Sequence, residues 1–450
     1  MFDLPRLTRR LVASGPAETL ISPLDGRRLV DVPTSTVADV AEAAKVARGA
    51  QAEWAETAIE DRMRLMVELH DAVLDSRDDL ADLIQTEAGK SRLSAMEEVL
   101  HVALTARYYG QTARRHLHSE RGSGILPLLT RIDRHAVPKG VVGVIGPWNY
   151  PLTMAVSDAL SAITAGNGVV IKPDSKTPLC TLAATQLLEQ VGLPQELWQV
   201  VNGPGGVLGP ALIDQVDYVC FTGSTATGRS VARQCAERLI GCSLELGGKN
   251  PALVLDDADL AQAVPGLVRA CFANAGQLCV SIERLYVAQG LLPEFTERFV
   301  AAAAALRLGA RLDYSADVGC LIDTGQLERV SAHVDDARKR GATVLTGGRA
   351  RPDLGPLFYE PTVLTGVTPA MRCYADETFG PVVALYPMAD DEDGIAQANA
   401  SAYGLNASIW TGDPARGRRV ARRIACGTVN VNEGFAATFG SLDAPMGGMK

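Results

Sequence analysis

The chain has 450 residues, 47% of them hydrophobic and 21% charged, which is too long for one ordinary domain and typical of a globular protein with a sizeable core. Its formal net charge of −9 argues against a general nucleic-acid surface. The nine cysteines form no CxxC pair and the six histidines form no HExxH motif, so we expect no metal site and a reducing, cytoplasmic environment. No apolar run reaches the roughly eighteen residues of a membrane span, and we expect no contact with a membrane.

The first part of the chain is predicted to be helical. Residues 36–118 alternate apolar and charged residues at helical spacing, and Ser35 and Thr36 are plausible cap residues before the first helix. Glycines, prolines and short β-prone pieces follow from residue 119, which predicts a protruding hairpin.

From residue 141 onward, short β-branched runs alternate with helical segments. This alternation predicts an α/β fold with parallel strands covered on both faces, and such a sheet binds ligands at the carboxyl ends of its strands. The expected strands of the first series are 141–147, 168–173, 197–203, 216–224 and 241–248. A second α/β series begins near residue 250, and we place the break between the two units near 247–250.

Cys279, in the segment NAGQLCVSIER (274–284), is the first candidate for chemistry. It is either a small buried hydrophobic residue or a nucleophile. A cysteine protease would pair it with a histidine, but nothing around the nearest ones, His333 and His135, resembles a protease signature. Glu245 ends an apolar strand before a glycine pair, and burial there would raise its pKa and suit it to general base catalysis. A salt-bridged glutamate at a crossover is the alternative.

Several other residues follow predicted strands. Asn149, in IGPWNYP (145–151), either donates to an oxyanion or forms a turn. Lys172 lies where a nucleotide ribose or phosphate would bind. Gly223 and Ser224 precede a helix, and their backbone N–H groups either meet a pyrophosphate or form an ordinary strand-to-helix turn. The segment DETFGPV (376–382) offers an acid for ribose hydroxyls and an aromatic ring for a flat ligand; the alternative is an exposed acid beside a core aromatic residue.

In this order the segments resemble the aldehyde dehydrogenase superfamily. The resemblance runs from about residue 20 to 450 and rests on PWNYP, KPDSKTP, FTGSTATG, ELGGKNP, NAGQLC, ETFGPV, YGLNAS, GTVNVN and PMGGMK. It implies a Rossmann-type cofactor domain, a second α/β catalytic domain and a small oligomerisation excursion. We expect the cofactor domain to comprise residues 1–112 and 136–247, and the catalytic domain to comprise residues 248–443. The oligomerisation excursion is expected at residues 113–135.

The resemblance also implies roles for individual residues. Cys279 attacks the aldehyde, hydride passes to nicotinamide, and Glu245 activates the water that hydrolyses the thioester, while Asn149 and the backbone of Cys279 bind the oxyanion. The implied cofactor-binding residues are Trp148, Lys172, Ser175, Gly223, Ser224, Leu246, Glu377 and Phe379.

Two departures bear on specificity. NAD-preferring relatives often carry glutamate three residues after the lysine, whereas this chain has Ser175, which predicts NADP as the preferred cofactor with NAD as the alternative. KGVVGVIGPWNYP and AGQLCVSIERLYV resemble succinate-semialdehyde dehydrogenases within the family. Many of those enzymes hold the substrate carboxylate with two arginines, and this chain has Ser157 and Ala273 at these positions. Arg284 is then either another partner for the carboxylate or a structural residue of its strand.

The resemblance further implies a homodimer or homotetramer. Relatives continue past the GGMK segment through a strand that joins a partner subunit, so we expect residues 444–450 to be a truncated tail or the end of a protein that lacks one. Two rival functions are a CoA-acylating enzyme, which would commonly lack the glutamate base, and a non-catalytic structural or binding member, which would be expected to lose the nucleophile or the base.

Overall fold

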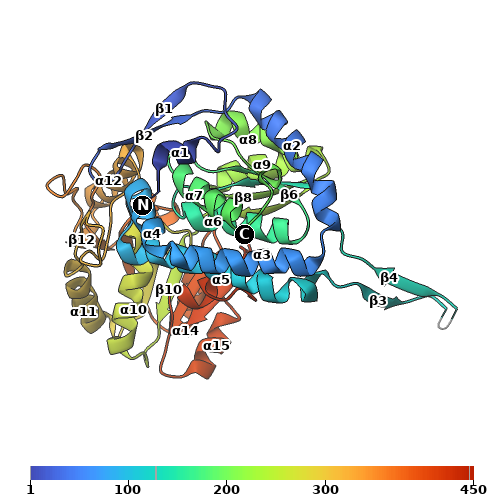
Figure 1. The fold of residues 1–450 in the computed structure, drawn as a ribbon. Helices are drawn as coiled ribbons and strands as arrows, with labels where there is room; N and C mark the ends of the chain where they lie inside the picture. The colour runs from blue at the N-terminus through green and yellow to red at the C-terminus, as the bar shows by residue number, and fades with distance from the viewer. Residues whose placement is uncertain (1, 127–128, 445) are drawn as a thin grey trace.

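Two mainly parallel β-sheets, one in each half of the chain, organise the molecule (Figure 1). The computed structural model describes residues 2–126, 129–444 and 446–450. The tip of the predicted hairpin at 127–128 and one residue of the predicted tail, at 445, lie outside the described residues. In the described part of the chain, no helix is long and apolar enough to cross a membrane.

The N-terminal part is helical, as predicted. After a short helix and an antiparallel strand pair, Thr36 caps the first long helix in a capping box with Asp39. The elements are α1 (Leu4–Thr8), β1 (Ala17–Ile21), β2 (Arg28–Pro33), α2 (Val37–Glu56), α3 (Ile59–Asp75), α4 (Arg77–Ala88) and α5 (Arg92–Leu117).

The predicted hairpin is present and extends away from the body of the molecule (Figure 1). Strands β3 (Glu120–Ser123) and β4 (Arg131–Arg134) pair in antiparallel orientation. The expected boundary at residue 113 is wrong for the first residues, because α5 continues its hydrogen bonding to Leu117. Ile125 and Leu129 are 91% and 82% exposed, so this excursion presents apolar side chains to solvent.

The first sheet has the strand order β7-β6-β5-β8-β9 and is parallel throughout. All five strands expected from the sequence are observed, with helices between them. The order reverses at β5, so a crevice opens between the carboxyl ends of β5 and β8. The elements are β5 (Val141–Ile145), α6 (Pro151–Thr164), β6 (Gly168–Lys172), α7 (Pro178–Gln190), η1 (Gln195–Leu197), β7 (Trp198–Val200), α8 (Gly205–Ile213), β8 (Tyr218–Thr222), α9 (Thr225–Glu237) and β9 (Gly241–Glu245).

The second sheet has the order β12-β13-β14-β11-β10-β15-β16, with only β12 antiparallel. Its central strands are buried along their whole length and form one core with the helices packed on them. The elements are β10 (Asn250–Val254), α10 (Leu260–Phe272), η2 (Ala273–Gly276), β11 (Ile282–Ala288), α11 (Leu292–Ala304), α12 (Thr324–Lys339), β12 (Thr343–Thr346), β13 (Thr362–Thr365), α13 (Arg372–Ala375), β14 (Val382–Met388), α14 (Asp391–Asn399), β15 (Asn406–Trp410), α15 (Pro414–Ala421), β16 (Thr428–Val431) and α16 (Ala436–Phe439).

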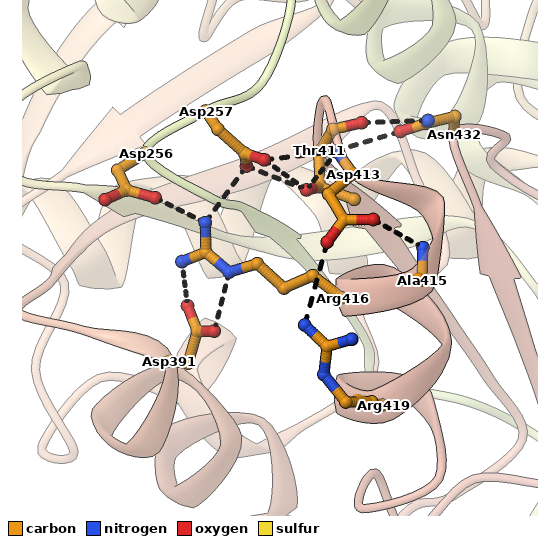
Figure 2. A network of polar contacts seen from close by, with 9 residues as sticks. All are labelled: Asp256, Asp257, Asp391, Thr411, Asp413, Ala415, Arg416, Arg419 and Asn432. Carbon is orange, nitrogen blue, oxygen red and sulfur yellow. Dashed lines mark hydrogen bonds and ion pairs between the residues drawn. The ribbon is translucent and has the colours of Figure 1, made fainter.

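A polar network closes the carboxyl end of this second sheet (Figure 2). Arg416 of α15 forms ion pairs with Asp256 and Asp257, which follow β10, and with Asp391, which begins α14. Thr411, after β15, donates to Asp257. The opposite, amino end of the second sheet faces the first sheet's crevice, since Cys279, just before β11, lines one cavity with Thr222 and Glu245 at the ends of β8 and β9.

Candidate active site

A cavity of about 190 Å³ brings the three predicted catalytic residues together. Asn149 follows β5 and Glu245 ends β9, so both come from the carboxyl end of the first sheet. Cys279 precedes β11 and therefore comes from the amino end of a strand in the second sheet. The site thus lies at the seam between the two sheets.

The turn before Cys279 has an unusual backbone. The four-residue η2 turn contains Asn274 and Ala275 with φ of 51° and 55°, in the left-handed region that non-glycine residues rarely adopt. Hydrogen bonds stabilise it: Asn274 Nδ2 donates to the carbonyl of Gln277 at 3.0 Å, and Gln277 Nε2 donates to the carbonyl of Cys320 at 3.1 Å. This tight turn ends the preceding helix and directs Cys279 into the cavity.

The thiol of Cys279 is protonated at neutral pH in this structure. Burial, and next the carboxylates of Glu245 and Glu377, raise its pKa to about 12. The backbone N–H groups of Cys279 and Val280 act in the opposite direction, since they donate to the sulfur. A base must therefore remove the proton as the thiol reacts.

Glu245 is the carboxylate placed to do so. Burial raises its pKa to about 7, with a smaller contribution from Asp158, which is the direction expected from the sequence. Among the described residues Glu245 has no ion-pair partner, which removes the salt-bridge alternative for this part of the chain. Its carbonyl accepts a hydrogen bond from Gly223 N at 3.0 Å, so the base and the predicted pyrophosphate turn are directly joined.

Asn149 is buried and held from both halves of the chain. Its Nδ2 donates to the carbonyl of Gln277 at 3.0 Å, and its own carbonyl accepts from Asn274 Nδ2 at 3.2 Å. An asparagine amide has two N–H hydrogens, so one stays available to an oxygen in the cavity.

A buried ion pair fixes the helix that starts directly after Asn149. Glu98 accepts hydrogen bonds from the N–H groups of Leu152 and Thr153, both at 3.0 Å, at the start of α6. Lys90 Nζ lies 2.6 Å from Glu98 Oε1 and 3.2 Å from the centroid of the Tyr150 ring. Both charged side chains are fully buried. A carboxylate at a helix N-terminus is stabilised by the free N–H groups there, which anchors the segment that carries Asn149.

A second cavity of about 520 Å³ continues from the first. The two share Trp148, Gly223 and Ser224, so one groove runs from Lys172 to Cys279. Ser224 caps the thirteen-residue helix α9, whose N-terminal N–H groups face this groove.

The donor set of the groove fits a nicotinamide dinucleotide. At one end of the groove, the ammonium group of Lys172 and the N-terminus of α9 can bind phosphates. At the other end, the carboxylate of Glu377 can bind ribose hydroxyls. Gly205, Gly206 and Gly209 of α8 line this groove beside Lys172. Leu246 packs against Gly228 of α9, where a Cβ would meet it at 2.4 Å.

The adenosine end holds Lys172 but not Ser175. Lys172 is buried, which lowers its pKa, and its Nζ donates to the carbonyl of Pro173 at 2.8 Å. Asp174 lines the same cavity, so this end carries one cation and one carboxylate. Ser175 is half-buried, and it is not among the described residues that line either cavity. Lys176 instead reaches across to Asp323, at 2.7 Å, in the second half of the chain.

The opposite end holds Glu377 and Phe379. Burial raises the pKa of Glu377 to about 7, and its Oε1 accepts from Gly248 N at 2.9 Å. The Phe379 ring meets the Trp148 ring edge to face, with centroids 5.4 Å apart. Glu377 is therefore a half-buried acid in the cavity wall and not an exposed one.

Of the two alternatives for Arg284, the structure supports the structural residue and contradicts substrate binding. Its guanidinium donates to the carbonyls of Lys249, Gln397 and Ala398, at 2.8, 3.2 and 3.1 Å, and the side chain is buried among them. It joins neighbouring segments of the second sheet. Ser157 lies one turn beyond Met154 on α6, with its Oγ 3.5 Å from His101 Nδ1.

Comparison with known proteins decides the family. The chain matches the Aldehyde dehydrogenase family over residues 13–450. It belongs to the aldehyde dehydrogenase family. A protein of Mycolicibacterium smegmatis named "Putative succinate-semialdehyde dehydrogenase (NADP(+))" is 51% identical over 94% of this chain and 82% of its own length. The mitochondrial succinate-semialdehyde dehydrogenase of Oryza sativa is 36% identical over 95% of this chain and 81% of its own.

Solved structures agree on the fold. An NADP-dependent enzyme of E. coli superposes with a TM-score of 0.93 at 33% identity, covering 100% of this chain and 95% of that one. An NAD+ complex of a Bacillus cereus aldehyde dehydrogenase gives a TM-score of 0.91 at 34% identity, covering 97% of this chain and 88% of that one. The α/β fold with its Rossmann-type half is therefore confirmed.

Some residues of this aldehyde dehydrogenase's cavity were not predicted. Tyr150, Met154 and Leu278 form its apolar wall, and Gln326 and Arg329 reach it from α12. The three apolar residues adjoin motifs that the sequence marked. The two polar residues lie on a helix whose pattern is that of an ordinary surface helix, so no signal identified them. Among the described residues no cluster of potential metal ligands is present.

Proposed function

We propose that this aldehyde dehydrogenase oxidises succinate semialdehyde to succinate with NADP as the preferred cofactor. The observation that carries the reaction class is the convergence of Cys279, Glu245 and Asn149 on one cavity joined to a dinucleotide-shaped groove. The names of the relatives from Mycolicibacterium smegmatis and rice support the substrate.

The first step is attack of the Cys279 sulfur on the aldehyde carbon. Glu245, with a pKa of about 7, accepts the thiol proton directly or through a water molecule. The carbonyl oxygen becomes an alkoxide, and the Asn149 amide donates to it, which stabilises the charge as it forms. Cys279 is then joined to the substrate as a thiohemiacetal.

The second stage needs an acceptor and then water. A nicotinamide dinucleotide, when bound, supplies the acceptor for the hydride that leaves the substrate carbon. Collapse of the alkoxide leaves a thioester on Cys279. Glu245 first releases the thiol proton to solvent and so becomes a base again. It then takes a proton from water, the hydroxide adds to the thioester carbon, and the Cys279 sulfur leaves as a thiolate as the carboxylic acid is released.

The cofactor preference rests on charge at the adenosine end. Position 175 carries no carboxylate to repel a 2′-phosphate, and Lys172 is the cation beside it. Asp174 opposes this preference, so the ratio of kcat/KM for NADP and NAD is the deciding measurement. A strong preference for NAD would refute this part of the proposal.

A panel of aldehydes tests the substrate. Succinate semialdehyde should give a higher kcat/KM than uncharged aliphatic aldehydes of similar length, measured by formation of reduced dinucleotide. A preference for the uncharged compounds would refute the substrate and leave aldehyde oxidation. Positions 157 and 273 are serine and alanine, so neither supplies an arginine for the substrate carboxylate.

Two further properties belong to the same proposal. The protruding hairpin, with its exposed Ile125 and Leu129, would pair with a partner subunit in a homodimer or homotetramer in the cytoplasm. Light scattering at several concentrations tests this assembly. Formation of free acid and not acyl-CoA in the presence of CoA tests the hydrolytic outcome that Glu245 supports. Loss of aldehyde oxidation in a Cys279→Ala variant separates the enzyme from a non-catalytic binding protein.

A further inference from the structure

Glu283 is a carboxylate in a strand that is otherwise built for burial. Every residue of β11 is buried, and Glu283 is 4% exposed. Burying an ionised carboxylate is costly unless it is paired and hydrogen-bonded. The partners of Glu283 therefore indicate why a charge is present at this position.

The carboxylate has an ion-pair partner and two backbone partners. Lys249, itself 2% exposed, donates to Glu283 Oε2. The N–H of Thr378 lies 3.0 Å from each carboxylate oxygen, and the N–H of Phe379 lies 3.0 Å from Oε1. Glu283 thus joins the strand that follows Cys279 to the loop that carries Glu377 and Phe379.

That loop needs such an anchor because its backbone is strained. Phe379 has φ of 56°, and a non-glycine residue keeps this strained conformation only where its surroundings hold it there. In the same loop, Gln326 Nε2 donates to the carbonyl of Phe379 at 2.6 Å, and Gly248 N donates to Glu377 Oε1. Two charged side chains contact the backbone of this loop: Arg329 donates to the carbonyl of Glu377, and Glu283 accepts from Thr378 and Phe379. Of the two, Glu283 is buried and bonds to the strained residue itself, and hydrogen bonds to charged groups are the stronger ones.

We infer that Glu283, with Lys249, is a positioning residue for hydride transfer. The inference rests on the proposed function, since it assumes that Glu377 and Phe379 hold the nicotinamide end of the cofactor. The carboxylate sets the loop's conformation, and the loop sets the distance between the cofactor ring and the carbon attached to Cys279. Glu283 touches neither the substrate nor the cofactor groove, because it is not among the described residues lining either cavity.

The test compares Glu283→Gln with the double variant Lys249→Met/Glu283→Gln. The single variant leaves Lys249 buried without its partner and could fail to fold for that reason. The double variant removes both charges and avoids this problem. Glu360→Gln is the matched control, because Glu360 lies before β13 and pairs with surface arginines. Each folded protein is assayed for aldehyde oxidation, and for cofactor-free cleavage of 4-nitrophenyl acetate, which needs Cys279 but no hydride acceptor.

We expect kcat for aldehyde oxidation to fall roughly 10- to 100-fold, because a shift of about 1 Å in a reacting group has an effect of this size. The primary isotope effect with a deuterated aldehyde should rise as hydride transfer becomes limiting. Ester cleavage should stay within about twofold of wild type.

An unchanged kcat and isotope effect in a folded variant would overturn the inference. A parallel fall in ester cleavage would also overturn it, because the role would then be structural. The aldehyde used is whichever one the wild type oxidises best, so a different substrate preference does not affect this test. If the wild-type protein oxidises no aldehyde with either NAD or NADP, the proposed function is wrong, which is a different outcome from failure of this inference.

Discussion

Replacing Glu245 with glutamine should separate the two halves of the reaction. Glutamine keeps the size of the side chain and removes the base, which typically contributes about 10²–10⁴-fold to a proton transfer. Both proton transfers assigned to Glu245 lose their base in this variant: that of the Cys279 thiol before hydride leaves, and that of water afterwards. Acylation should therefore slow, with solvent taking the thiol proton, and thioester hydrolysis should slow further. The variant should therefore accumulate acyl-enzyme on Cys279, and its steady-state turnover should fall by about the same factor.

The structure also gives the pH dependence of the wild type. With a pKa of about 7, Glu245 is about 9% ionised at pH 6 and about 91% ionised at pH 8. A step limited by this base should accelerate roughly tenfold between these values. The sign follows from the raised pKa: the active, ionised form is lost as the pH falls through 7.

Rapid-quench and stopped-flow kinetics measure both effects. Glu245→Gln should show a burst of up to one reduced dinucleotide per site, followed by a slow phase that lacks the pH dependence, and intact mass spectrometry should detect the acyl group. Cys279→Ala, the control, should show neither burst nor acylation. A Glu245→Gln variant with wild-type turnover, or with the same pH profile as wild type, would refute the assignment of the base.

The other residues of the site give three further predictions. Asn149→Ala should lower kcat by about 10²–10³-fold with a smaller change in aldehyde KM, because one oxyanion donor is lost; steady-state kinetics that match wild type would exclude the role. Ser175→Glu should lower kcat/KM for NADP relative to NAD by roughly tenfold or more, since like charges would meet; an unchanged ratio would place the 2′-phosphate elsewhere. Lys90→Met should lower the free energy of unfolding by about 3–5 kcal/mol in urea titrations, because it leaves Glu98 buried without its cation, and the double variant with Glu98→Gln should recover part of the loss; a change below about 1 kcal/mol would contradict this account.

The sequence predicted the elements, and it pointed to the three residues that we propose to react, because those signals are local. Runs of β-branched residues alternating with amphipathic helices are sufficient to place β5 to β9 and the helices between them. Cys279, Glu245 and Asn149 each adjoin glycine or proline turns at the ends of strands, and the family resemblance fixed which of several alternatives applied. The structure adds that all three line one cavity.

What the sequence did not predict depends on contacts between distant segments. Glu98 accepts a hydrogen bond from the N–H group of Leu152, which lies 54 residues later in the chain. In the sequence, nothing in its amphipathic helix distinguishes Glu98 from a solvent-exposed glutamate. The sequence left the role of Arg284 undecided for the same reason, because two of its partners, Gln397 and Ala398, lie more than a hundred residues away. Glu283 carried one usable signal, a charge inside a β-branched run, but its function required knowing where the loop at Thr378 lies.

The division of the reacting groups between two sheets has a consequence for how this enzyme can fail. Asn149 and Glu245 belong to one sheet and Cys279 to the other, and the hydrogen bonds among Asn149, Asn274 and Gln277 cross the seam. Neither sheet alone carries all three residues of the proposed catalytic centre. Heat, pressure or a mutation that loosens the docking of the halves would abolish turnover while leaving most helices and strands intact, so catalysis would report on interdomain alignment well before spectroscopy detected unfolding.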